Sequence, residues 1–166
     1  MGNKYFKSHK MSPIQSVVWQ MMSIRNTYQN IESSSINKDS LTCVMKITPS
    51  ENSDTYTVEI SYKYGKYPQA KLLSHKLEKR NGKYPHHIFG FDKDDHAILC
   101  VFHKGTDGWN KDVLISKSFI PWVSTWLNTY EYWLITGEWH YSEMFIEEDG
   151  NDKGGDKNDP TNKTTN

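Results

Sequence analysis

The sequence predicts an α+β fold, a single domain in which the helices are segregated from an antiparallel sheet. Three observations predict it: apolar residues at helical spacing near the N-terminus, alternating apolar and polar residues in the middle of the chain, and helical spacing again towards the C-terminus. A long irregular segment that contains a cysteine precedes the second helical segment. We therefore expect an N-terminal helix, an antiparallel β-meander, a long loop with a cysteine and a C-terminal helix.

The first predicted helix begins at Ser12 and Pro13, a capping residue followed by a first-turn proline. The apolar residues that then recur at helical spacing are Ile14, Val17, Val18, Met21, Ile24, Tyr28 and Ile31. Such a stripe can dock a partner, but in most proteins it faces the core. We interpret it as packing.

The middle of the chain predicts a β-hairpin, because apolar residues alternate with polar ones over residues 41–47 and again over residues 56–62. Cys43 falls on the apolar face of the first strand, so we expect a buried and unreactive thiol. A third strand is predicted over residues 70–77, and residues 79–83 have the composition of a turn. Together these strands predict a meander.

The segment 84–95 mixes proline, glycine, histidine and aspartate without periodicity, which predicts a long loop. It leads into the apolar run 97–102, where Cys100 lies just before a polar segment. Helical spacing returns over residues 119–134 and ends before Gly137. We expect the tryptophans and tyrosines of this second helix to be large core anchors, since no basic groove accompanies them.

Length and charge narrow the class of protein. The chain has 166 residues, and its 20 lysines and arginines balance 20 aspartates and glutamates, so nothing indicates binding to nucleic acid or to a membrane. Two cysteines in separate segments, and no apolar stretch suited to a signal peptide or a membrane span, predict a cytoplasmic protein. We expect residues 1–146 to form the domain and residues 147–166 to be a disordered polar tail.

Cys100 is the candidate nucleophile, because a thiolate attacks carbonyl carbon and neighbouring polar groups control how often it forms. The alternative is a buried strand thiol. His96 lies four residues earlier, where an extended chain would place it on the same face, and His87 precedes it in the loop. A protonated His96 imidazole would stabilise a thiolate or donate to an oxyanion, and the alternative is a histidine that faces solvent at the strand end. The nearby aspartates at positions 92, 94 and 95 would orient a histidine, lower the pKa of an incoming lysine or simply face solvent.

A zinc site is the other chemistry that these residues offer. His87, His96, Cys100 and His103 are ligand types that zinc accepts. Only Cys100 and His103 have the close spacing typical of zinc ligands, so the sequence favours a site without a metal or any other cofactor.

A series of short motifs resembles that of the ubiquitin-conjugating enzymes and their divergent bacterial relatives. In that family a Tyr-Pro pair follows the second strand, a His-Pro-Asn motif precedes the cysteine, and a tryptophan follows it. The matching segments here are Tyr67-Pro68, Pro85-His86-His87-Ile88, Ile98-Leu99-Cys100, Trp109 and Val113-Leu114-Ile115-Ser116. The resemblance covers most of residues 11–137 and implies a UBC-like fold, with residues 1–146 as one conjugating domain and an active-site loop around the cysteine.

The resemblance implies that Cys100 carries an acyl group as a thioester, with Tyr67, Pro68 and Trp109 as scaffold. The family uses the asparagine of His-Pro-Asn to support the oxyanion, and this chain has His87 there, with a longer gap before the cysteine. Either His87 or His96 would take over that role. A binding module of the same fold without activity is the alternative.

The closing segment 126–139 resembles the compact bacterial versions, which lie in short type II CBASS antiphage operons. That resemblance implies a protein partner with a C-terminal glycine, a cGAS-like nucleotidyltransferase. In other operons such a protein works with a ubiquitin-like protein and an activating enzyme, and this alternative stays open.

Overall fold

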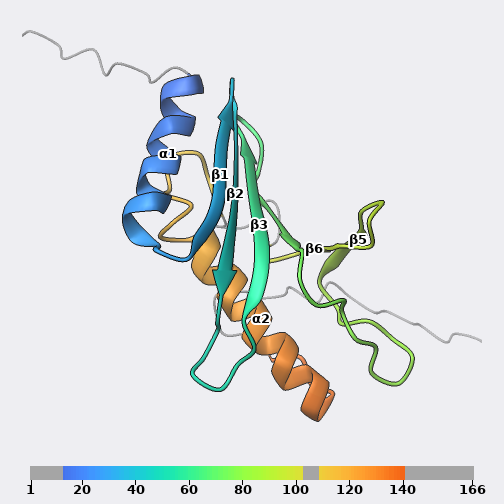
Figure 1. Ribbon diagram of the computed structural model, residues 1–166. Coiled ribbons are helices and arrows are strands. Elements are labelled where there is room, and N and C mark those ends of the chain that lie inside the picture. The colour runs from blue at the N-terminus through green and yellow to red at the C-terminus, as the bar shows by residue number, and fades with distance from the viewer. Residues whose placement is uncertain (1–12, 103–108, 141–166) are drawn as a thin grey trace, which may run out of the picture.

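The computed structural model describes residues 13–102 and 109–140 and confirms the α+β class, with an antiparallel sheet and helices. Figure 1 shows the sheet with one helix beside it and the other behind it. The strands follow the spatial order β1-β2-β3-β4-β6-β5, and all neighbouring pairs are antiparallel. The elements are α1 (Pro13–Thr27), β1 (Ile31–Asn37), β2 (Ser40–Ile47), β3 (Tyr56–Lys63), β4 (Gln69–Leu72), β5 (Ile88–Phe91), β6 (Ala97–Leu99) and α2 (Phe119–Thr136).

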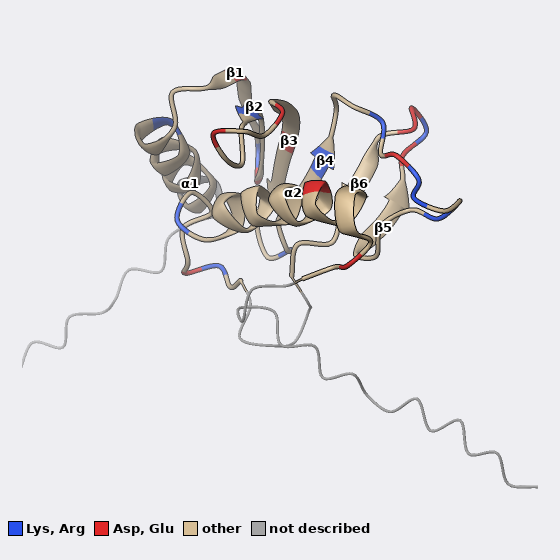
Figure 2. Cartoon of the chain, turned by 90° about the horizontal axis from the view of Figure 1, so that it is seen from below, with Lys and Arg blue, Asp and Glu red and all other residues tan. Residues whose placement is uncertain are grey.

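Both helices lie on one face of the sheet (Figure 2). The burial of side chains alternates along β2 and β3: every second residue is buried, and the residues between them are partly or fully exposed. One face of the sheet is therefore apolar, and the helices cover that face. Cys43 belongs to the buried set, pairs with Ile60 across the strands and is 0% exposed, which confirms the prediction of a core thiol. Burial raises the pKa of the Cys43 thiol.

The predicted hairpin is confirmed, but the helical spacing extended the first helix too far. α1 ends at Thr27, and Ile31 begins the strand β1. This strand was missed because its sequence, IESSSIN, has few apolar residues to alternate and its side chains stay largely exposed at the sheet edge. Pairing with β2 forms it.

The region 70–95 needs two corrections. The third predicted strand is shorter than expected, since β4 ends at Leu72. The predicted loop 84–95 contains β5, whose four residues are too few for a pattern to show. β5 is also irregular, because its register against β6 shifts between Ile88 and Gly90, where φ is +120°. The turn at 79–83 is confirmed by paired backbone bonds between Arg80 and Lys83.

α2 confirms the predicted second helix, and Gly137 ends it in the left-handed conformation with φ of +85°. Most of its aromatic residues are core anchors as predicted, although Tyr132 is an exception at 43% exposed. The one charged residue in α2 is Glu131, which accepts hydrogen bonds from the Ser53 and Tyr56 hydroxyls at 2.6 and 2.9 Å. This carboxylate ties α2 to the β2–β3 connection.

Gln20 joins α1 to the segment that leads into α2. Its side chain is 0% exposed, and its amide donates to the carbonyl of Val113 at 2.9 Å and accepts from the N–H of Ile115 at 2.8 Å. Tyr28 donates to the carbonyl of Ser116 at 2.9 Å. These bonds fix the chain just after the site loop against the first helix.

Three predictions concern residues outside the described part of the chain: the helix cap at Ser12, the zinc candidate His103 and the tail 147–166. No helix in the described part is both long and apolar enough to cross a membrane.

Candidate active site

Cys100 directly follows the last residue of β6. Its backbone N–H donates to the carbonyl of His87 at 2.9 Å, which continues the β5–β6 pairing by one more bond. Its thiol lies 3.7 Å from the carbonyl of Phe102, and the residue is 9% exposed. The cysteine therefore directly follows a strand and is buried, although it does not belong to the main apolar cluster.

His87 is joined to Cys100 through the backbone. Its backbone has a φ of +63°, a left-handed conformation that residues other than glycine rarely adopt. Its carbonyl accepts a second hydrogen bond, from the indole Nε1–H of Trp126 at 3.0 Å. Its imidazole stacks on Trp139, with ring centres 5.8 Å apart and an interplanar angle of 28°. One residue thus connects β5, the cysteine and the aromatic side chains of the α2 region.

His96 lies at the opposite end of the β5–β6 pair. Since β6 is extended, the four residues from His96 to Cys100 span roughly 13 Å. The His96 imidazole Nδ1 lies 3.2 Å from the carboxylate of Asp92, which confirms that an aspartate of the 92–95 run orients a histidine. The structure does not bring this imidazole to the cysteine.

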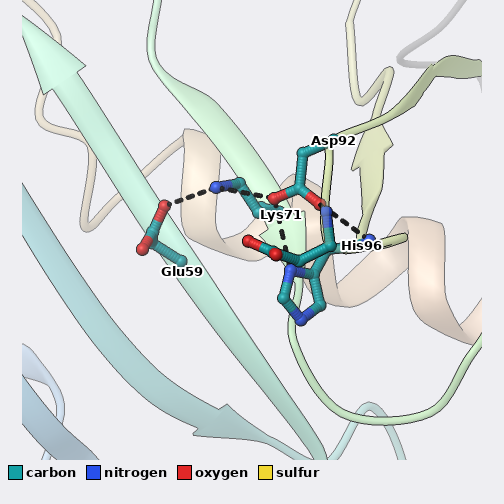
Figure 3. Close-up of polar contacts among 5 residues, drawn as sticks. Glu59, Lys71, Asp92 and His96 are labelled. Atoms are coloured by element: carbon teal, nitrogen blue, oxygen red, sulfur yellow. Dashed lines mark hydrogen bonds and ion pairs between the residues drawn. The ribbon is translucent and has the colours of Figure 1, made fainter.

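Asp92 organises its own end of the strand pair. One carboxylate oxygen accepts from the N–H groups of Asp94 and His96, each at 2.9 Å, and the other faces Lys71 at 3.2 Å. Lys71 in turn contacts Glu59 at 3.3 Å, as Figure 3 shows. The backbone N–H of His96, followed by the Lys71 ammonium, holds the pKa of the Asp92 carboxyl well below its usual range.

The described members of the alternative zinc set, His87, His96 and Cys100, do not all come together. His87 and Cys100 lie at one end of the β5–β6 pair, and His96 lies at the other. Asp92, Asp94 and His96 do bring ligand atoms within 4.8 Å of one another. Within this cluster the Lys71 ammonium already pairs with the Asp92 carboxylate.

A groove of about 470 Å³ opens beside the residues that flank Cys100. Its wall is mostly apolar and aromatic, and its charged residues are two lysines. The lining residues are Ser40, Leu41, Thr42, Ser61, Tyr62, Lys63, Lys66, Tyr67, Pro68, Gln69, Phe89, Leu99, Val101, Phe102 and Phe119. The Tyr67 ring packs on Phe102 at 5.4 Å, so the Tyr-Pro pair forms part of the scaffold next to the site.

Sequence reasoning missed two residues of this site, Trp126 and Trp139. The helical spacing identifies Trp126 as a core residue, and it is 1% exposed, but spacing does not show that its indole N–H reaches His87. Trp139 follows the end of α2, where no periodicity gives it a direction. Trp109 is buried against Tyr62 at 5.1 Å between ring centres, consistent with the scaffold role expected for it.

An antiparallel sheet covered by helices, with a cysteine at the end of a strand beside a histidine, is consistent with the E2-like class of conjugating proteins. A family model for type II CBASS E2 proteins matches residues 20–146, and the chain belongs to that family. Membership supports an E2-like role in CBASS defence, a conjugating type of enzyme and a protein partner from the same operon. No curated protein matches the chain.

Proposed function

We propose that Cys100 carries an acyl group as a thioester and passes it to an acceptor in antiphage defence. The observation that supports this most is the position of Cys100 in a type II CBASS E2 protein, at the end of β6 and bonded to His87. Cys43, the other cysteine, is 0% exposed in the core and serves no such role. The donor is a partner protein with a C-terminal glycine, by resemblance a cGAS-like nucleotidyltransferase.

In the proposed reaction the Cys100 thiolate attacks the activated carbonyl carbon of that glycine, which arrives as an acyl adenylate or a thioester. A carbon–sulfur bond forms, and the leaving group departs with the electron pair of the bond that breaks. An amine of the acceptor then attacks, the carbon–sulfur bond breaks, and the sulfur regains its electron pair while the amine releases a proton to solvent. Each step passes through an oxyanion, which a nearby hydrogen-bond donor stabilises.

His87 is the proposed donor to that oxyanion, in the place where the ubiquitin-conjugating enzymes have asparagine. Its carbonyl already bonds the Cys100 N–H, which keeps the two residues together. His96, the other candidate, is less suited because Asp92 holds its Nδ1 at the far end of β6. Neither proposed step needs a metal ion or another cofactor.

The decisive experiment is mass spectrometry of the protein expressed together with its operon neighbours. We expect an adduct on Cys100 that a thiol reagent releases and whose mass contains the partner's C-terminal glycine. Cys100→Ser should give a thiol-resistant ester or no adduct, and Cys43→Ser should still form the thiol-labile adduct. Full conjugation by Cys100→Ser would refute the proposal.

The same experiment separates the alternatives. An adduct with a ubiquitin-like protein would identify that protein as the donor and would exclude the nucleotidyltransferase as the donor. A stable complex without any covalent adduct, under conditions where the operon defends cells, would instead indicate a binding module of this fold.

A further inference from the structure

We propose that Trp139 is a positioning residue, which holds the imidazole of His87 in one orientation beside Cys100, while Trp126 holds the His87 backbone. This inference rests on the proposed function, since it assigns a role to side chains that contact His87 rather than the reacting atoms. It extends the site from the loop and strand that carry the cysteine to α2 and the residues after it.

The first observation is the stack itself. The Trp139 and His87 rings lie 5.8 Å apart and are tilted by only 28°. Stacking uses the face of an imidazole, whereas hydrogen bonding uses its edge. The contact therefore restricts the direction of the ring nitrogens without occupying them.

The second observation is that Trp139 is itself held in place. Its indole meets the edges of Trp126 and Trp133 on α2, with ring centres 5.3 and 6.4 Å apart. The segment around it is bonded to the helix, since the Thr129 hydroxyl donates to the His140 carbonyl at 3.4 Å and the Glu138 N–H donates to the Thr136 hydroxyl at 3.0 Å. A ring anchored in this way restrains whatever stacks on it.

The third observation concerns the backbone of His87. A left-handed φ of +63° is unfavourable for a residue with a side chain, so surrounding contacts must maintain it. The Trp126 indole and the Cys100 N–H, which bond the same carbonyl at 3.0 and 2.9 Å, supply such contacts. With the backbone held, rotation of the side chain is the freedom that remains, and Trp139 removes it.

Orientation matters to the chemistry because a donor stabilises an oxyanion only when it points at the position that the oxygen will occupy. A misdirected donor lowers the rate of the chemical step and leaves partner binding unchanged. That difference separates a positioning role from a general loss of folding.

The test compares Trp139→Phe with Trp139→Leu, since both keep an apolar side chain and only phenylalanine can stack. We expect Trp139→Leu to lower the rate of Cys100 adduct formation at saturating partner by about tenfold, with the half-saturating concentration unchanged within about twofold. Trp139→Phe should stay within about threefold of the native rate. The matched control is Tyr132→Leu, which truncates an aromatic ring that is 43% exposed and packs on His140.

A double-mutant cycle shows whether the effect passes through His87. In a His87→Ala background, Trp139→Leu should cause no further loss of rate, because the ring that it positions is absent. Equal rates for the phenylalanine and leucine variants, or a full additional loss in the His87→Ala background, would overturn the inference.

A second measurement needs no partner protein. The ring protons of His87 should show a ring-current shift in NMR spectra that Trp139→Phe largely retains and Trp139→Leu abolishes. An unchanged His87 signal in Trp139→Leu would refute the positioning role directly. Absence of any adduct in the native protein, with the NMR signature present, would instead refute the proposed function alone.

Discussion

At the scale of single residues, the two cysteines show how far a sequence pattern predicts chemistry. Alternation places Cys43 in the core, and the structure confirms it. The boundary between an apolar run and a polar segment singles out Cys100, which directly follows the last residue of β6. The even spacing of His96 and Cys100 was misleading, because a shared face of a strand does not bring together residues at its two ends.

Substitutions of the two histidines distinguish their roles. We expect His87→Ala to lower the rate of acyl transfer by about a hundredfold, as loss of one oxyanion donor does in other enzymes. His87→Asn should retain more activity than alanine, because an amide can donate in the same place. The measurement is a single-turnover assay of the Cys100 adduct with an amine acceptor.

His96→Ala is the matched control for these variants, since its ring bonds Asp92. Its transfer rate should stay within about twofold of native. If His96→Ala slowed transfer as much as His87→Ala, the assignment of the supporting residue to His87 would be wrong.

At the scale of elements, the periodic segments were predictable and the two edge strands were not. α1, β2, β3 and α2 each carry a long apolar repeat, whereas β1 and β5 form because a neighbouring strand offers its backbone. Hydrogen bonds between side chains and distant backbone groups were equally unpredictable from the sequence. Gln20 looks like a surface residue of a helix, and its two backbone partners lie 93 and 95 residues away.

Gln20→Leu tests this connection between α1 and the segment before α2. The variant leaves the partly buried Val113 carbonyl and the buried Ile115 N–H without the bonds that Gln20 provides. We expect the free energy of unfolding to fall by about 2–3 kcal/mol, measured by urea denaturation. Asn26→Leu, at an exposed position of the same helix, should change it by less than about 0.5 kcal/mol.

Asp92→Asn tests the turn between β5 and β6. The carboxylate accepts the N–H groups of Asp94 and His96, so its neutral replacement should speed amide hydrogen exchange at those two positions. Asp94→Asn, which leaves the Asp92 carboxylate intact, should not. Protection that is the same in Asp92→Asn and the native protein would show that the turn does not depend on this charge.

The same turn should respond to acid. The Asp92 pKa lies below its ordinary value of 3.8, so the folded state favours the carboxylate. Its contribution to stability is present above that ordinary value and is lost as the pH falls through the lower pKa of the folded state. Exchange at Asp94 and His96, corrected for its intrinsic pH dependence, should therefore rise at low pH in the native protein and be less sensitive to acid in Asp92→Asn.

At the scale of the whole molecule, the candidate site depends on parts of the chain that are distant in sequence. The end of the β5–β6 pair supplies Cys100 and His87, α2 supplies Trp126, and the segment after α2 supplies Trp139. The sequence motifs single out Cys100 and His87, but they do not predict the pairing of β5 with β6 that joins them. The others follow from how α2 lies on the sheet, which is a property of tertiary packing and leaves no signature in local spacing.

Burial in this core also makes the free energy of unfolding decrease at alkaline pH. The pKa of Cys43 is raised above its ordinary value of 9.0 by burial, and the same cause raises the pKa of Tyr28, Tyr62 and Tyr130 above 10.0. Above pH 9.0 the unfolded chain begins to lose protons that the folded protein keeps, so the unfolded state binds fewer protons and the free energy of unfolding falls as the pH rises. Each such group adds at most about 1.4 kcal/mol per pH unit to the slope.

Urea denaturation between pH 7 and 10.5 measures how steeply the free energy of unfolding falls with pH. The variant Cys43→Ala shows how much of that fall is due to the Cys43 thiol. The variant should be less stable at pH 7, since it leaves a small cavity in the core, and should lose less of its remaining stability between pH 9.0 and 10.5 than the native protein does. Cys100→Ala serves as the comparison because it removes the other thiol at the edge of the core. Parallel curves for Cys43→Ala and the native protein would mean that the Cys43 thiol ionises as readily in the folded protein as in the unfolded chain, contrary to its burial.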